Sequence, residues 1–153
     1  MKTVIRFDLL VVLSLFLSSG VSAQTDSRPC PQSLLAMETL AVELPALDVE
    51  AAWKRADREE SQLGKYLYGI VQEGAVDLSP AEGEDVHAAA VRVKGASGVA
   101  LHFDQFHLPV GAELWVTDAT GMWQEGPYDF RDNDDHGRLA TGDVPGEWAV
   151  IRL

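Results

Sequence analysis

The stretch VALHFDQFHLPVGAELWVTDATG, residues 99–121, holds two runs in which apolar and polar residues alternate, separated by the turn-like sequence LPVG at 108–111. Alternation with a period of two is typical of strands, because successive side chains point to opposite faces of a sheet. We therefore predict strands over 98–106 and 112–118. The residues expected to face the core are Val99, Leu101, Phe103, Leu114 and Val116.

The same alternation continues on both sides of this stretch. It predicts strands at 65–72, 87–95 and 147–153, and an extended segment or edge strand ending at Leu44. Short strands at intervals of about ten residues are typical of an antiparallel β-sandwich or jelly roll. We expect a mostly β domain of this kind over residues 38–153.

One segment has the helical period instead. Residues 48–63 begin with Asp48, whose side chain can cap the first free N–H groups of a helix, and Gly64 follows the segment. Apolar residues recur on one face of this segment and charged residues on the other. We predict one short helix, at about 48–63, near the N-terminus of the domain.

The N-terminal 23 residues have the pattern of a secretory signal peptide. Lys2 and Arg6 form a basic start, an apolar run covers 9–17, and small residues precede a cleavage position after Ala23. The apolar run is shorter than the about 20 residues that a membrane-spanning helix needs. We expect a secreted or periplasmic bacterial protein from which 1–23 is removed, with no membrane attachment after cleavage.

Residues 24–37 follow the predicted cleavage position and begin with a polar, proline-bearing sequence, which predicts a flexible leader. The leader contains the only cysteine of the chain, Cys30. A single cysteine forms no internal disulfide, so the fold depends on its hydrophobic core and Cys30 is expected to be a free thiol on the leader.

The chain is strongly acidic. Its formal net charge is −12 at pH 7, and loss of residues 1–23 changes this to −13. Nucleic acids and anionic membranes repel such a surface, so we expect neither as a partner. A cationic partner fits this charge better.

Two histidines and an aspartate in the opening stretch are candidates for chemistry. His102 and Asp104 share one face of the predicted strand, where they could bind Zn²⁺ or polarise a water molecule, and His107 follows near the turn. The simpler interpretation, which we favour, is a solvated strand face opposite the core residues.

An acidic loop is the best candidate for a metal site. Asp132, Asp134, Gly137 and Asp143 fall at positions 1, 3, 6 and 12 of an EF-hand-like loop, which makes Ca²⁺ the one candidate cofactor. However, His136 occupies a position that needs an oxygen ligand, and aspartate replaces the usual bidentate glutamate. A solvated turn built on Asn and Asp is the favoured interpretation, and we predict no cofactor.

Catalytic motifs are missing from the sequence, which contains no Gly-x-Ser-x-Gly and no phosphate-binding loop. Trp115, Trp123 and Trp148 could instead form a platform that stacks on sugar rings. Trp115 is expected to be partly exposed, because it lies on the strand face opposite Leu114 and Val116. A role for these tryptophans in the core or in covering a sheet is the simpler interpretation.

Five stretches follow one another in an order that resembles a known family. They are LPALDVEAAW (44–53), GIVQEGAVDLSP (69–80), LHFDQFHLPVGAELWVTDATG (101–121), EGPYDF (125–130) and GDVPGEWAVIRL (142–153). Together they resemble the N-terminal pro-region domain of secreted bacterial lysyl-endopeptidase-like and related trypsin-like serine proteases. The resemblance covers about residues 38–153.

This resemblance implies a β-sandwich pro-domain that assists the folding of a serine protease catalytic domain, inhibits it, or both. The peptidase motifs of the family, including Gly-Asp-Ser-Gly-Gly, do not occur in this chain. The resemblance therefore implies a fold and a partner, and no catalytic residue. The chain is expected to be a stand-alone protein of this type or the remnant of a truncated protease, and not an enzyme.

Two other interpretations remain open. One is a secreted binding module for carbohydrate or another surface ligand, using Trp115 and Trp123. The other is a small metal-dependent enzyme built on His102, Asp104 and the acidic loop, which predicts stoichiometric metal in the purified protein.

Overall fold

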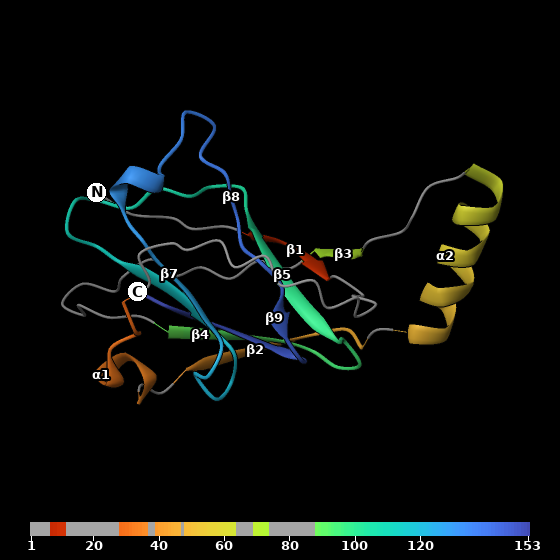
Figure 1. Ribbon diagram of the computed structural model, residues 1–153, viewed down its shortest axis with the longest axis horizontal. Coiled ribbons are helices and arrows are strands. Elements are labelled where there is room, and N and C mark those ends of the chain that lie inside the picture. Colours follow the sequence, from red (N-terminus) through yellow and green to blue (C-terminus); the bar gives the residue numbers. More distant parts are fainter. Residues whose placement is uncertain (1–6, 12–27, 37–38, 47, 64–68, 74–87) are drawn as a thin grey trace.

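The computed structural model describes residues 7–11, 28–36, 39–46, 48–63, 69–73 and 88–153. The described chain is mostly β, as the alternating pattern predicts, and forms two five-stranded sheets (Figure 1). The first sheet contains β1 (Phe7–Val11), β3 (Ile70–Glu73), β5 (Gly98–Phe103), β8 (Leu139–Ala140) and β9 (Val144–Pro145). The second contains β2 (Leu40–Leu44), β4 (Ala88–Val93), β6 (Leu114–Thr117), β7 (Gln124–Tyr128) and β10 (Trp148–Arg152). The helices are α1 (Gln32–Leu35), α2 (Val49–Leu63) and the 3₁₀ turn η1 (Phe130–Asp132).

Strand order places β5 and β10 inside the two sheets. The order is β3-β1-β5-β8 in the first sheet, with β9 also pairing β5, and β2-β4-β10-β6-β7 in the second. One pair departs from the predicted antiparallel arrangement, because β2 runs parallel to β4, with Val42 opposite Val91. The predicted strand at 65–72 is observed from Ile70 onward, and its residues 65–68 lie outside the described part of the chain.

The core lies between the sheets and contains the predicted apolar stripe. Val99, Leu101, Phe103, Leu114 and Val116 are all at most 2% exposed. They belong to one cluster with residues of β4 and β10, including Val93 and Ile151. The period-two prediction for the opening stretch is therefore confirmed on both strands.

The predicted helix is observed with the predicted cap. α2 begins after Asp48, whose Oδ1 accepts a hydrogen bond from the N–H of Ala51 at 2.9 Å. Only a narrow stripe of α2 is covered: Ala52 is buried, whereas Trp53 is 36% exposed. Figure 1 shows α2 beyond the end of the sheets, on the side of β3, and not over a sheet face.

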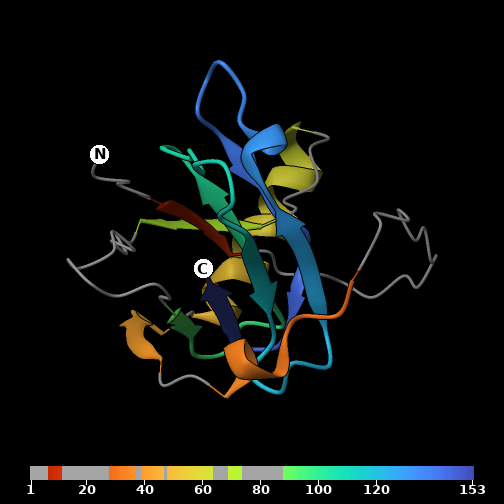
Figure 2. The same cartoon turned by 90° about the vertical axis from the view of Figure 1, so that its left-hand side faces the viewer.

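Of the predicted flexible leader, 24–37, the structure describes residues 28–36, which contact the rest of the protein, while 24–27 and 37 lie outside the described residues. Arg28 forms an ion pair with Glu113 at 2.6 Å, and the N–H of Cys30 donates to Oε1 of Gln124 at 2.9 Å. Figure 2 shows this orange segment crossing in front of the second sheet next to the C-terminal end of β10. Polar contacts at several points fix the segment on the sheet, which its composition did not indicate.

Cys30 is consequently not a thiol on a tail. It is 4% exposed, and burial raises the pKa of its thiol, an effect that nearby Arg152 partly offsets. At pH 8 we expect Cys30 to react with an alkylating reagent on the order of 100-fold more slowly in the folded protein than in urea, because access and thiolate formation are both reduced. Equal rates in the two conditions, followed by mass spectrometry, would contradict the docked position of the leader.

β1 lies inside the segment predicted to be a cleaved signal peptide. Phe7–Val11 pairs antiparallel with β3 on one side and with β5 on the other. Among the described residues, no helix is long and apolar enough to cross a membrane. Export and cleavage after Ala23 stay predictions, and cleavage would remove a strand from the first sheet.

Candidate functional site

A cavity of about 590 Å³ lies beside β5 and β8 of the first sheet. Its described polar lining consists of His102, Asp104 and Arg138. Its described apolar lining comes from Val71, Phe103, Leu139 and Ala140. The cavity is therefore lined by two of the three residues that the sequence suggested for chemistry, together with Arg138 from a distant part of the chain.

Strand register brings these groups together. His102 on β5 is exposed and lies opposite Ala140 on β8, while the neighbouring Phe103, opposite Leu139, is buried. Arg138 immediately precedes β8, and its N–H donates to Oδ1 of Asp134 at 3.1 Å. This hydrogen bond stabilises the turn before β8, and Arg138 at the end of this turn lines the cavity.

The described lining combines three polar residues, His102, Asp104 and Arg138, with apolar ones. Lining of this mixed kind is typical of sites that bind a ligand. His107 is exposed in the connection after β5 and is not part of the lining. His102 and Asp104 are both exposed, and Asp104 lies just past the end of β5 at Phe103, not in the strand as predicted.

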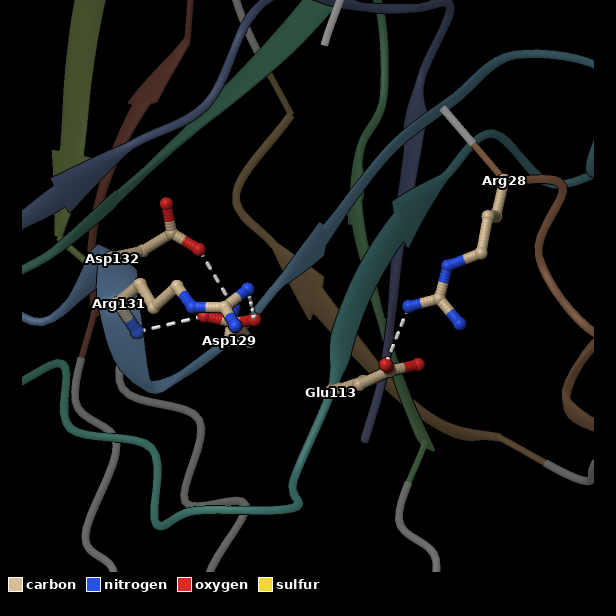
Figure 3. Close-up of polar contacts among 5 residues, drawn as sticks. All are labelled: Arg28, Glu113, Asp129, Arg131 and Asp132. Carbon is tan, nitrogen blue, oxygen red and sulfur yellow. Dashed lines mark hydrogen bonds and ion pairs between the residues drawn. The ribbon is translucent and has the colours of Figure 1, made fainter. Parts of the chain in front are cut away.

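In the acidic loop, two of the candidate metal ligands, Asp132 and Asp134, accept hydrogen bonds from backbone N–H groups. Asp129 and Asp132 form a reciprocal capping box around the start of η1 (Figure 3). Oδ2 of Asp132 accepts a hydrogen bond from the N–H of Asp129 at 2.7 Å, and Oδ1 of Asp129 accepts one from the N–H of Arg131, also at 2.7 Å. Asp134 accepts from the N–H of His136 at 2.9 Å in the following turn. The N–H of Arg138, which also donates to Asp134, and the N–H of His136 stabilise the charged carboxylate and lower the pKa of Asp134.

Asn133 in the same loop performs a role that the sequence did not indicate. Its side-chain Oδ1 accepts from the N–H of Leu108 at 2.8 Å, and its Nδ2 donates to the carbonyl of Leu108 at 2.9 Å. This pair of bonds joins the loop to the connection between β5 and β6. An asparagine within an acidic run is the only signal in the sequence, and it does not identify the partner.

Asp143 lies apart from the other loop candidates. Its neighbour is Glu125 on β7, whose Oε2 accepts from the N–H of Gly142 at 2.8 Å. Burial and the negative charge of Glu125 raise the pKa of Asp143. Within the described residues, no group of three or more His, Cys, Asp or Glu side chains is arranged to hold a metal ion.

Asp143 gives a pH-dependent prediction. Because its pKa is higher in the folded than in the unfolded state, the charged carboxylate destabilises the fold, and this cost grows as the pH rises above about 3.8, the ordinary value. Asp143→Asn is therefore expected to raise the Tm by about 1–2 °C at pH 7, a small gain because the group is partly solvated, and to have no such effect below pH 3.8. Thermal melts from pH 3 to pH 7 measure this. The matched control is the exposed Asp135→Asn, and an identical pH profile for both variants would contradict the prediction.

The tryptophans offer little surface for stacking on a sugar. Trp115 is 1% exposed, so the expectation that it is partly exposed is wrong. Trp123 is half-buried and packs against the core cluster. The guanidinium of Arg92 lies 5.1 Å from the centre of the Trp148 ring and takes up one of its faces.

Comparison with protein-family models, with curated protein sequences and with solved structures finds no match for this chain.

Proposed function

We propose that this chain is a secreted, non-catalytic domain of the pro-region type, which binds the catalytic domain of a secreted serine protease and assists its folding or restrains its activity. The observation that carries the proposal is the ordered series of five stretches that resembles such pro-regions. The described parts of these stretches include β5, β6 and β10, the strands that supply much of the core.

The charge of the chain supports a partner of this kind. A net charge of −12, or −13 after loss of residues 1–23, favours association with a basic protein surface. Electrostatic attraction of this type speeds the encounter and weakens as salt rises. A basic catalytic domain is the partner that fits both the resemblance and this charge.

The cavity beside β5 and β8 supplies polar residues for a binding role. Its described lining includes His102, Asp104 and Arg138. We assign these three residues to ligand binding.

The test combines the chain with a purified lysyl-endopeptidase-like catalytic domain. We expect added chain to slow cleavage of a lysyl substrate or to raise the yield of active protease on refolding from denaturant. An unrelated protein of similar size and net charge is the control for nonspecific electrostatic effects. If neither rate nor yield responds to the chain, or if the control protein acts equally well, the proposal is wrong.

A further inference from the structure

Asp104 and Arg138 occupy facing positions at one end of the β5–β8 pair. They are the residues next beyond the last registered pair of these antiparallel strands. Just past them, the N–H of Phe106 donates to the carbonyl oxygen of Gly137 at 2.6 Å, so the two chains stay together on both sides of these positions. An aspartate and an arginine are thus held on neighbouring segments, and both line the cavity of about 590 Å³.

The two opposite charges do not form an ion pair with each other. Between described residues, no ion pair or side-chain hydrogen bond involves the carboxylate of Asp104 or the guanidinium of Arg138. Both residues are exposed at the cavity. A negative and a positive group in this arrangement can each bind the opposite charge of one ligand, and a guanidinium suits a carboxylate best because it donates two parallel hydrogen bonds.

The rest of the described lining favours a ligand with an apolar body. Val71 on β3 is 61% exposed, and Leu139 and Ala140 on β8 supply further apolar lining. β3 and β8 stand at opposite ends of the strand order β3-β1-β5-β8, so the lining extends across the first sheet (Figure 1). The volume falls within the range of about 300–1,000 Å³ that small-molecule sites have, which exceeds what a single charged group needs.

His102 adds a group that suits a peptide bond. It lies on β5, one residue before the end of the strand, and lines the same cavity. A neutral imidazole has one nitrogen that donates a hydrogen bond and one that accepts, as a peptide group does. The lining therefore presents a carboxylate, a guanidinium and an imidazole beside apolar side chains.

We propose that this cavity binds a short apolar peptide with free termini, whose ammonium group contacts Asp104 and whose carboxylate contacts Arg138. Its apolar side chains lie against Val71 and the residues of β8. The inference rests on the proposed function for the assignment of these residues to ligand binding, and it does not involve the protease partner. The complementarity of two opposite charges and an apolar body selects this class of ligand.

The first experiment titrates the full chain with leucyl-leucine in a calorimeter, where we expect saturable one-to-one binding. Two modified probes each remove one charge: N-acetyl-leucyl-leucine lacks the ammonium group, and leucyl-leucine amide lacks the carboxylate. Each is expected to bind about fivefold more weakly than leucyl-leucine, the effect of one partly solvated ion pair.

The second experiment assigns each end of the peptide to one side chain. Asp104→Asn is expected to weaken leucyl-leucine about fivefold without further weakening the acetylated probe, and Arg138→Gln to do the same with respect to the amide probe. The matched controls are Asp135→Asn and Lys94→Gln, which make the same charge changes at exposed positions outside the described lining. Thermal melts verify that all four variants are folded.

Every outcome bears on the proposal. Absence of saturable leucyl-leucine binding up to about 10 mM would overturn it, and so would equal affinity for the three probes. Cavity variants that act no differently from their controls, or that respond to the wrong end of the peptide, also contradict it. No protease is present in these assays, so their failure leaves the proposed partner untouched, and failure of the protease assays leaves the peptide site untouched.

Discussion

Phe106→Ala is expected to cost about 3–5 kcal/mol of unfolding free energy, the range found when a buried aromatic side chain is truncated in a packed core. Phe106 is 1% exposed, although it lies in the connection that follows β5 and not in a strand. Its ring makes edge contacts with Phe103, at a centroid distance of 5.6 Å, and with Tyr128, at 6.5 Å. The truncation therefore leaves a cavity between residues of both sheets.

Urea unfolding followed by tryptophan fluorescence measures this loss. The matched control is Phe130→Ala, because Phe130 is 39% exposed at the start of η1 and is expected to cost less than about 1 kcal/mol. A domain of this size has a total stability of about 5–15 kcal/mol, so Phe106→Ala should leave a protein that is marginally folded. Similar losses for the two variants would show that the connection does not pack as described.

Gly126→Ala is expected to destabilise the fold by about 3 kcal/mol or more. Gly126 has a φ of +112°, and an added Cβ would lie 2.7 Å from the carbonyl oxygen of Leu114 and 3.1 Å from the N of Tyr128. Both neighbours are backbone atoms of the β6–β7 pair, which cannot move without disturbing the strands. The variant combines conformational strain with a direct collision.

Gly111→Ala separates these two effects. Gly111 has a φ of +94°, but nothing lies within 4 Å of an added Cβ. This control is expected to cost only the conformational strain, about 1–2 kcal/mol. Equal losses in urea unfolding at the two positions would contradict the close approach of β7 to β6 at Gly126.

The positions of most strands and the faces they turn to the core could be predicted from the alternation of apolar and polar residues, since this pattern depends only on local chain geometry. The core faces of β5 and β6 and the Asp48 cap of α2 are examples. The burial of Trp115 could not be predicted in this way. Alternation identifies two faces of a strand, but it does not say what covers the second one.

The second face of β6 and β10 lies near the leader. Trp115 lies opposite Arg152 in the strand register, and the buried Cys30 is close enough to Arg152 to affect its pKa. The hydrogen bond from the N–H of Cys30 to Gln124 joins residues 94 positions apart. Such long-range contacts leave no periodic signal in a single sequence.

The candidate site was predictable in part for the same reason. The spacing of His102 and Asp104 indicates that they lie close together, and both line the cavity, although β5 ends at Phe103. Arg138 joins them because it immediately precedes β8, which pairs with β5. In the acidic loop, sequence spacing placed Asp143 with Asp132 and Asp134, but the chain turns through η1 and β8 before Asp143 and brings it to Glu125. Spacing predicts ligation only where the intervening chain forms a compact loop.

The most direct test of the central claim is the formation of a complex between the chain from which 1–23 has been removed and a lysyl-endopeptidase-like catalytic domain. Light scattering on a size-exclusion column measures the mass of any complex at low and high salt. We predict a one-to-one complex at low salt that weakens as salt rises, because the acidic surface of the chain contributes to association. Separate elution of the two proteins at every salt concentration, with an unchanged cleavage rate and refolding yield of the protease, would contradict the account.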